Sequence, residues 1–402
     1  MAASVAALCI GLSGCTGSAE PERTNAAGPS GQSAPRSPAE SADTTQPGVV
    51  IESNVGANAH DVAVDTRLSL RATEGSIEKV TVVGAGERTV PLPGRIADGG
   101  DRWHATDLLE PGSTYTVDIV AVTADGTRTE RRRAFHTAKL PLDRQTYPSI
   151  APLDGETVGV GMPVEITFDV PVSDRAAVER HLEVTASEPV TGAWHWYSDT
   201  KVHFRPKRHW EPGTEVTVSA DLNGVSAGNG IYGQLDREIS FDIGTSVVSK
   251  IYIKRHKMDV FVGGELARTI PVTTGKKGFE TRGGTKVIME KHRTKRMDAA
   301  TTGISPDDPE YYNIADVPYA LRVTYSGEFL HGAPWSVDSQ GDANVSHGCV
   351  GMSIADARWL FRHSTRGDIV QVFGSDRKLE PGNGWTDWNV SFAEYKQASA
   401  LS

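Results

Sequence analysis

The sequence predicts a mainly β protein with three domains in its folded part. The chain has 402 residues, which is more than a single hydrophobic core usually holds. Its 41 Gly and 22 Pro favour turns over long helices. From residue 48 onward, short runs of alternating apolar and polar residues recur between Gly, Pro and Asp signals, which is typical of strands joined by turns.

The first 47 residues are not expected to join the folded core. Residues 1–15 carry no charge, are mostly small or apolar, and end in Leu12-Ser13-Gly14-Cys15, which resembles a bacterial lipobox. The segment is too short to span a bilayer, so we expect an export signal cleaved before Cys15, whose lipidation would anchor the chain to the outer face of the cytoplasmic membrane. A plain secretory signal is the alternative, and the missing positive residues suggest a true start a few residues upstream. Residues 16–47 lack large apolar side chains and are expected to be a disordered tether.

The next two segments, residues 48–140 and 141–247, each predict a small antiparallel β-sandwich. A weak internal repeat supports this, because residues 109–117 and 210–218 both carry a Glu-Pro-Gly turn that leads into an alternating strand. Their separation of about 100 residues is the size of one immunoglobulin-like domain. We therefore predict two tandem immunoglobulin-like domains without the usual buried disulfide. The expected strands include 68–71, 80–83 and 115–119 in the first domain, and 164–168, 201–204 and 215–218 in the second.

Residues 248–375 predict a third β-rich domain. It begins with strand-like runs around Gly263-Gly264, a turn typical of a hairpin. A helix is expected from Ser353 to about Arg362, because Ser353 can cap it and apolar residues recur on one face, and residues 367–373 predict a closing strand. The C-terminal extension, residues 376–402, is more aromatic than a disordered tail and is expected to fold back on a neighbouring domain. An exposed binding tail is the alternative.

Charge and cysteine content bear on the partners and on the cross-links of the chain. The formal net charge is -10, and the basic runs lie inside strand-like patterns, so we expect no binding of nucleic acid. Of the three cysteines, Cys9 and Cys15 lie in the N-terminal segment, which leaves Cys349 alone in the folded part. No internal disulfide is therefore expected there, and no cofactor is predicted.

Two histidines and this lone cysteine lie within 19 residues, from His331 through His347 to Cys349. A catalytic thiol needs a neighbouring imidazole or another positive field that lowers its pKa, and both histidines are candidates. An inert buried cysteine beside histidines with structural hydrogen bonds is one alternative. A zinc site with these three side chains as ligands is another, although we predict no metal.

The string Ser346-His347-Gly348-Cys349, with His331 upstream, resembles the signature of the YkuD-type L,D-transpeptidases. The two upstream sandwich domains are similar to those of the mycobacterial and actinobacterial branch of that family. The resemblance extends over roughly residues 48–400. It implies that Cys349 is the nucleophile and that His331 takes its proton, while the backbone carbonyl of Gly332 orients the imidazole. His347 and Gly348 would belong to the loop whose backbone amides stabilise the oxyanion.

The resemblance also implies a substrate cleft under a flap formed by about residues 297–325. The residues expected to bind substrate there are Tyr312, Met297, Trp335, Ser346, Gly332 and Asn344. For Met297 and Trp335, simple packing in the core is the alternative. Two departures from the family pattern stand out: Gly351 replaces the usual Asn or Arg two residues after the cysteine, and Thr302 stands where relatives often carry an aromatic lid residue. We expect these departures to affect the binding of substrate or the closure of the flap over it.

The activity implied by the resemblance is the formation of 3→3 cross-links in peptidoglycan. Cys349 would form a thioester with a tetrapeptide stem, release D-Ala, and pass the acyl group to the diamino acid of a second stem. Carbapenem-type β-lactams would acylate the same cysteine. An L,D-carboxypeptidase, a sortase, and a non-catalytic envelope protein that binds the cell wall are the alternatives. Secretion into the cell wall is the alternative to lipid anchoring for the location of the protein.

Overall fold

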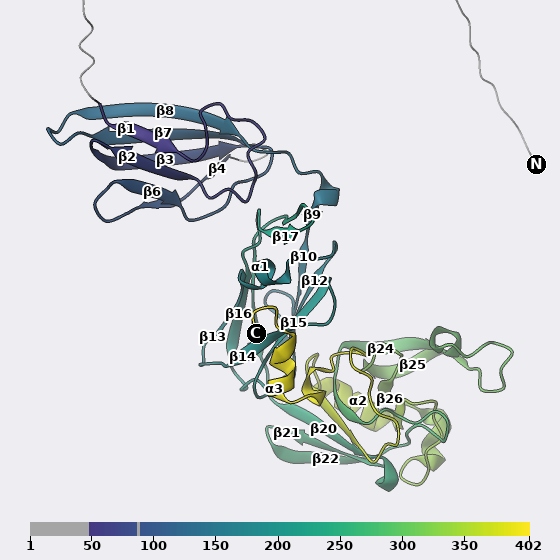
Figure 1. Ribbon diagram of the computed structural model, residues 1–402. Coiled ribbons are helices and arrows are strands. Elements are labelled where there is room, and N and C mark those ends of the chain that lie inside the picture. Colours follow the sequence, from purple (N-terminus) through teal and green to yellow (C-terminus); the bar gives the residue numbers. More distant parts are fainter. Residues whose placement is uncertain (1–47, 87–88) are drawn as a thin grey trace, which may run out of the picture. The chain divides into compact units, whose positions relative to one another are not determined.

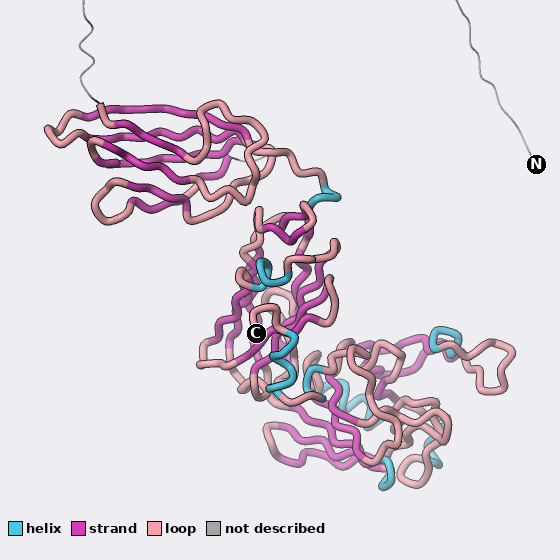
Figure 2. Tube along the Cα trace, viewed as in Figure 1, coloured by secondary structure: helices cyan, strands magenta, loops and turns pink. Residues whose placement is uncertain are grey.

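A computed structural model describes residues 48–86 and 89–402, and β-strands dominate this part of the chain (Figure 1, Figure 2). The predicted export segment, residues 1–15, and the predicted tether, residues 16–47, lie outside the described residues. Among the described residues, no helix has both the length and the apolar character needed to cross a membrane.

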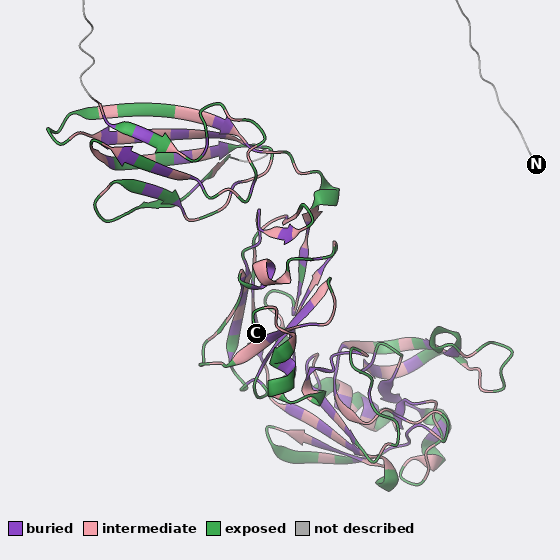
Figure 3. Cartoon of the chain, in the orientation of Figure 1, coloured by how far each residue is buried: buried purple, intermediate pink, exposed green. Residues whose placement is uncertain are grey.

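The first domain is a sandwich of two four-stranded sheets, as its alternating pattern predicted. In β7, every second residue from Tyr115 to Ala121 is buried, and the residues between them are half-buried, which is the two-residue period of a strand with one face on the core (Figure 3). One sheet has the order β1 (Val50–Ser53), β2 (Ser69–Thr73), β6 (Arg102–Ala105) and β5 (Gly94–Ile96); the other has the order β4 (Thr89–Pro91), β3 (Ser76–Ala85), β7 (Thr114–Val122) and β8 (Arg128–His136).

The second domain is also a sandwich. Its first sheet has the order β10 (Pro148–Ala151), β12 (Val164–Phe168), β15 (Lys201–Pro206) and β14 (Gly192–Trp196). Its second sheet has the order β11 (Thr157–Val158), β19 (Arg237–Ile243), β16 (Glu215–Ala220) and β13 (Leu182–Ala186). A small third sheet of β17 (Ser226–Gly228), β18 (Ile231–Gly233) and β9 (Gln145–Thr146), the helix α1 (Arg175–Glu179) and a 3₁₀ turn at Leu142–Arg144 complete it.

The internal repeat marks the same structural feature in both sandwiches. Gly112 and Gly213 adopt positive φ angles of 59° and 83°, which glycine accommodates most easily, and each turn leads into a central strand, β7 or β16. Before the turns, Leu109 and Trp210 are almost fully buried in their respective cores. The prediction of two tandem immunoglobulin-like domains is confirmed.

The third domain combines a five-stranded sheet with a four-stranded sheet around its own apolar core. The first has the order β22 (Glu265–Pro271), β21 (Lys257–Val262), β20 (Val247–Tyr252), β28 (Ile369–Phe373) and β23 (Gly284–Val287); the second has the order β24 (Glu290–Asp298), β25 (Asn313–Arg322), β26 (Phe329–Gly332) and β27 (Val350–Met352). Short 3₁₀ turns lie at Ile253–Arg255, Ala299–Thr302 and Pro334–Ser339.

The predicted hairpin and helix of this domain are both present. Gly263 and Gly264 have positive φ angles of 59° and 87° and join β21 to β22 in a tight turn. Helix α2 (Ile354–His363) begins after Ser353, whose Oγ accepts the backbone N–H of Asp356 at 3.1 Å. The closing strand predicted at residues 367–373 is β28, which pairs in parallel with β20.

The C-terminal extension packs on the second domain, as its aromatic content predicted. Trp385 is 6% exposed and Tyr395 fully buried, and the backbone carbonyl of Tyr395 lies 2.8 Å from Nδ1 of His195 in β14. The extension contains helix α3 (Phe392–Tyr395) and 3₁₀ turns at Asp387–Asn389 and Lys396–Ala398. The alternative of an exposed binding tail is therefore wrong for these two aromatic side chains.

A buried histidine holds this contact together. His203 in β15 lies between two carboxylates, with Nε2 2.9 Å from Glu165 and Nδ1 2.9 Å from Asp387 of the extension. Burial by itself would lower the pKa of His203, but these two carboxylates raise it to about 9. Both ring nitrogens therefore carry protons at neutral pH, and the imidazolium links the extension to the second domain.

This arrangement predicts a loss of stability in mild alkali. Because the folded-state pKa lies above the unfolded value near 6.5, the stabilisation is fully present below pH 6.5 and is lost as the pH rises through about 9. The free energy of unfolding should fall across this window by roughly 2 to 4 kcal/mol. Urea unfolding at pH 6 and pH 9.5 measures the change, and His203→Gln should remove most of it. Equal stability of the wild-type protein at both pH values would contradict the prediction.

Candidate active site

Two neighbouring strands bring the predicted nucleophile and base together. β26 and β27 pair in parallel, with His331 opposite Gly351. Cys349 precedes Gly351 by two residues, and the two-residue period of a strand places residues i and i+2 on the same face. The thiol of Cys349 and the imidazole of His331 therefore line the same cavity, although they are 18 positions apart in sequence.

This cavity has a volume of about 360 Å³. Among the residues predicted to form the site, Cys349, His331, His347, Tyr312, Met297, Trp335 and Ser346 line it. Thr273, Ile314, Ala333, Ser336, Ser339, Val345 and Gly351 also line it, and the sequence did not single out most of these as cavity residues. Gly332, Gly348 and Asn344 are not among the lining residues.

The hydrogen bonds of Asn344 explain its position away from the cavity wall. Its Oδ1 accepts the backbone N–H of Thr274 at 3.1 Å and the hydroxyl of Thr274 at 2.7 Å. The same oxygen lies 3.0 Å from Nδ1 of His256. The side chain thus ties the segment after β22 and the residue after the 3₁₀ turn at Ile253–Arg255 to the segment before the nucleophile, and the substrate contact predicted for Asn344 stays a prediction.

The carbonyl of Gly332 orients the imidazole of His331, as the resemblance implied. Nδ1 of His331 lies 2.9 Å from this oxygen. Because a carbonyl oxygen can only accept a hydrogen bond, Nδ1 carries the proton, and Nε2 keeps a lone pair that can accept one. Burial lowers the pKa of His331, so the ring is neutral at neutral pH and is available as a base.

The thiol of Cys349 is protonated in the free protein. The residue is 8% exposed, and Sγ lies 3.6 Å from the carbonyl oxygen of Gly327, its hydrogen-bond acceptor. Burial raises the pKa of Cys349 to about 12, and the charge of Glu328 adds to this effect. The sequence led us to expect a neighbouring positive group that lowers the thiol pKa, whereas burial acts in the opposite direction because it disfavours the charged thiolate. A neutral thiol thus faces a neutral imidazole.

The nucleophile loop has a conformation that requires glycine at one position. Gly348 has a φ of 120°, which L side chains rarely adopt. Its carbonyl accepts the hydroxyl of Thr281 at 2.7 Å, and its N–H donates to Oγ of Ser346 at 3.1 Å. Oγ of Ser346 in turn donates to the carbonyl of Cys349 at 2.6 Å. These bonds hold the loop on both sides of the sulfur.

His347 is held by the flap rather than by the thiol. Its Nε2 lies 2.7 Å from Oε2 of Glu310, and its ring contacts the rings of Phe279 and Tyr312. Glu310 also binds the ammonium of Lys276 at 2.5 Å. The side chain therefore joins the nucleophile loop to the segment between β24 and β25, which is part of the flap predicted at about residues 297–325.

The cavity walls combine buried and exposed apolar side chains. Met297 is 8% exposed and packs in one apolar cluster with Cys349, and Tyr312 packs against this cluster. Burial and the nearby Cys349 raise the pKa of Tyr312 to about 12, so its hydroxyl keeps its proton. Trp335, by contrast, is 53% exposed, and its ring stacks on His331 with 5.8 Å between the ring centres. Trp335 thus offers an open aromatic face beside the base.

Gly351, one of the two departures from the family pattern, fills a tight space. It pairs with Thr273 through two backbone hydrogen bonds of 2.9 Å. A Cβ atom at this position would lie 2.9 Å from Cβ of Ala333 and 3.0 Å from Cγ2 of Thr273. The usual Asn would not fit here without displacing its neighbours. The other departure, Thr302, ends the 3₁₀ turn at Ala299–Thr302, and its hydroxyl donates to the carbonyl of Ala299 at 2.8 Å.

Gly351→Asn should therefore destabilise the protein by about 1 to 3 kcal/mol, as overpacked cores usually do. Differential scanning calorimetry would measure the loss. Ala333→Gly removes the closest contacting atom, so adding it to Gly351→Asn should recover part of the lost stability. A Gly351→Asn protein that unfolds at the wild-type temperature would show that the neighbours yield easily and would refute this explanation.

The described residues contain no candidate metal site. Across residues 48–86 and 89–402, no three His, Cys, Asp or Glu side chains are grouped so that they could hold a metal ion. The three side chains of the zinc alternative, His331, His347 and Cys349, form no such group either.

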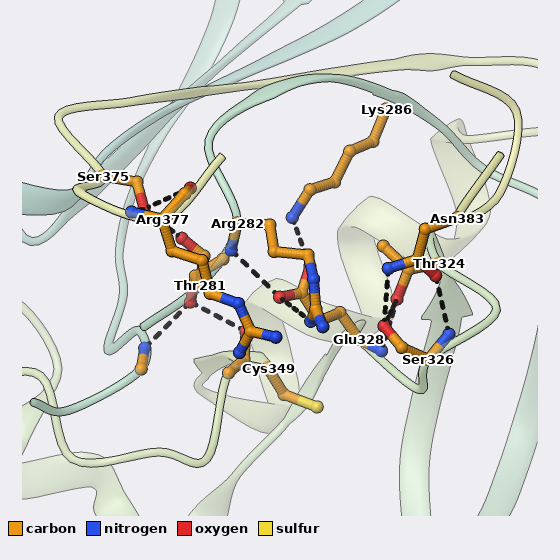
Figure 4. Close-up of polar contacts among 12 residues, drawn as sticks. Thr281, Arg282, Lys286, Thr324, Ser326, Glu328, Cys349, Ser375, Arg377 and Asn383 are labelled. Atoms are coloured by element: carbon orange, nitrogen blue, oxygen red, sulfur yellow. Dashed lines mark hydrogen bonds and ion pairs between the residues drawn. The ribbon is translucent and has the colours of Figure 1, made fainter. Parts of the chain in front are cut away.

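The sequence did not predict the buried ion cluster that lies beside Cys349. Lys286 and Arg282 both contact the carboxylate of Glu328 (Figure 4). The available signal was a lysine inside the strand-like apolar run at residues 284–289, since a charged residue there needs a partner. The sequence could not tell which carboxylate that partner would be.

Comparison with known proteins identifies the family. Residues 246–372 match the L,D-transpeptidase catalytic domain family, YkuD, and residues 59–226 match the bacterial Ig domain family. The chain is 35% identical over 351 residues to L,D-transpeptidase 2 of Mycobacterium tuberculosis, which covers 87% of this chain and 85% of that protein. It is 32% identical over 353 residues to L,D-transpeptidase 5 of the same species, with 86% and 75% covered.

Among solved structures, LD transpeptidase LdtMt1 in complex with imipenem is 38% identical, with a TM-score of 0.49, and covers 56% of this chain and 97% of its own. The two curated relatives settle the assignment, since their similarity covers 87% and 86% of this chain. The chain belongs to the L,D-transpeptidase family.

Proposed function

We propose that this protein forms 3→3 cross-links in peptidoglycan by a two-step acyl transfer through Cys349. The observation that carries the proposal is the shared cavity, in which a neutral thiol and an imidazole with a free Nε2 lone pair face the same space. Membership of the L,D-transpeptidase family supports the reaction class. The chemistry follows from the proton states of these two side chains.

In the first step, the thiol attacks the carbonyl carbon of the amide between the diamino acid and the terminal D-Ala of a tetrapeptide stem. The thiol proton passes to Nε2 of His331, and the carbonyl of Gly332 stabilises the imidazolium through Nδ1. The C–N bond then breaks, and His331 gives the proton to the leaving amine of D-Ala. The acyl group remains on Sγ as a thioester.

In the second step, the side-chain amine of another stem attacks the thioester. His331 accepts a proton from this amine and returns it to Sγ as the C–S bond breaks, so that the free thiol is restored. The exposed ring of Trp335 beside His331 is well placed to contact the acceptor stem. Water in place of the amine would give L,D-carboxypeptidase activity as a side reaction.

A purified disaccharide-tetrapeptide tests this function. The protein should release D-Ala and produce a dimer whose fragmentation shows a bond between the two diamino acids. Liquid chromatography with tandem mass spectrometry detects both products. A tripeptide monomer without any dimer would make the protein a carboxypeptidase, and the absence of all products would refute the proposal.

We also propose that carbapenems acylate Cys349. Their strained lactam carbonyl would meet the thiol in the same cavity, and opening of the ring would leave a thioester adduct on Sγ. Intact-protein mass spectrometry should show the addition of one carbapenem mass to the wild-type protein. An adduct that persists in Cys349→Ala would place the reaction elsewhere.

We propose further that the chain is anchored through lipidated Cys15, which lies outside the described residues. The lipobox-like string before this cysteine supports the proposal. Cys15→Ala, expressed in an actinobacterial host, should move the protein from the membrane fraction into the wall or the medium. An unchanged distribution would contradict lipid anchoring.

A further inference from the structure

Beside Cys349 lies a charge cluster that does not line the substrate cavity. Lys286 in β23 and Glu328, just before β26, are 1% and 5% exposed, and their charged groups lie 2.5 Å apart. Arg282 adds a second cation, 3.1 Å from the same carboxylate, and its backbone N–H donates to Oε1 of Glu328 at 3.0 Å. Figure 4 shows both cations converging on Glu328, next to Cys349.

A contribution to the stability of the fold does not by itself explain this buried charge cluster. Removing two charges from water is costly, and well-packed apolar residues often serve a fold at least as well as a buried ion pair. Arg282 also forms an ion pair toward the protein surface, because its Nε lies 2.5 Å from Oε2 of the half-exposed Glu380. Of the charges around Glu328, only that of Lys286 is fully enclosed.

The segment that carries Glu328 contacts the sulfur from both sides of this residue. The carbonyl of Gly327, one residue before it, accepts the thiol of Cys349 at 3.6 Å. Phe329, one residue after it, packs in one apolar cluster with Cys349, and its backbone lowers the pKa of the thiol. The carboxylate itself lies 3.6 Å from the position that a Cβ of Gly348 would occupy. Fixing Glu328 therefore fixes its two neighbours in the chain, Gly327 and Phe329, which contact Cys349.

We propose that Glu328, held by Lys286 and Arg282, is a positioning residue for Cys349 that aligns the sulfur and keeps the thiol neutral until substrate enters. This inference deepens the proposed function and rests on Cys349 being its nucleophile. A neutral thiol keeps its hydrogen bond to Gly327 and transfers its proton only when the substrate carbonyl is at hand.

The charges around the sulfur support this role. Burial raises the pKa of Cys349, the backbone N–H of Phe329 lowers it, Glu328 raises it, and Lys286 lowers it less than Glu328 raises it. Three other titratable groups line the space: His331 on β26, which is neutral, Tyr312 before β25, which keeps its proton, and His347, whose ring is held by Glu310. Glu328 is thus the charged group with the largest influence on the thiol.

The rate of alkylation by iodoacetamide between pH 7 and 9 tests the proposal, because it follows the thiolate fraction of Cys349 and needs no peptidoglycan. In Glu328→Gln, the negative charge is lost, and the thiol pKa should fall by about one unit. Since a thiolate of lower pKa is also a weaker nucleophile, the net increase in rate should be about three- to tenfold. Cross-linking by this variant should show a lower kcat with little change in KM.

Asp259→Asn is the matched control, because it removes another shielded carboxylate with a lysine partner, Lys257, from the same domain. Its alkylation rate should equal that of the wild-type protein. If Glu328→Gln does not fold, the double variant Lys286→Met and Glu328→Gln removes both buried charges. Because Glu328 outweighs Lys286, the double variant should still react faster than wild type.

Two outcomes separate this inference from the proposed function. A wild-type alkylation rate in the folded Glu328 variants, with only the unfolding temperature lowered, would overturn the positioning role, because the pair would then serve the fold alone. Faster alkylation in the Glu328 variants supports the positioning role even if the wild-type protein forms no cross-links, and that failure would refute only the proposed function.

Discussion

Replacing Cys349 with alanine is expected to abolish cross-linking, with a loss of at least about 10⁴-fold, the scale seen when an enzyme loses its covalent nucleophile. Cys349 is the sole cysteine of the chain after residue 15, so no second thiol can take its place. The assay is dimer formation from a disaccharide-tetrapeptide, followed by mass spectrometry.

The same variant should keep its fold and its cavity. The change removes one sulfur atom from an apolar cluster that includes Met297 and Phe329, so the unfolding temperature should fall only slightly. Cys349→Ser is the companion variant, because it keeps the size and polarity of the group with a much weaker nucleophile. Cross-linking by folded Cys349→Ala at more than a trace of the wild-type rate would refute covalent catalysis by this residue.

Replacing His331 with alanine should lower kcat by about 10² to 10⁴-fold, the range that general acid–base catalysis contributes. The effect should be large because the thiol pKa is raised to about 12, so little thiolate exists at neutral pH without a base to take the proton. The measurement is the rate of D-Ala release under saturating tetrapeptide. His363→Ala, at the exposed end of α2, is the control and should leave kcat unchanged.

The pH dependence of kcat/KM gives a second prediction for His331. Burial lowers the pKa of His331, so the acid limb of kcat/KM should have its midpoint below 6.5. In His331→Ala this limb should vanish, and the residual rate should rise with pH as the thiolate forms. A wild-type acid limb above pH 6.5, or an unchanged limb in the variant, would contradict the role of His331 as base.

Local patterns in the sequence predicted the elements that are defined by neighbouring residues. The two-residue period marked the strands of both sandwiches, the paired glycines marked the turn between β21 and β22, and Ser353 marked the start of α2. The motif from His331 to Cys349 likewise indicated two residues that the fold brings to one cavity, because His331 lies on β26 and Cys349 directly precedes β27, the strand that pairs with it.

Contacts between distant residues could not be predicted in the same way. Lys286 and Glu328 are 42 positions apart, and His203 and Asp387 are 184 apart, and no local period links the members of either pair. Asn344 lies within the motif region but serves hydrogen bonds to Thr274 that only the folded chain reveals. The raised thiol pKa has the same origin, because burial is a property of the complete fold.

The most direct test of the account is the identification of the acyl-enzyme. The protein is incubated briefly with a disaccharide-tetrapeptide, quenched in acid, and analysed by intact-protein and peptide mass spectrometry. Covalent catalysis by Cys349 predicts an added mass equal to the donor minus D-Ala, carried by the peptide that contains Cys349 and absent from Cys349→Ala. Cross-linked product without this adduct in the wild-type protein, or an adduct on another residue, would contradict it.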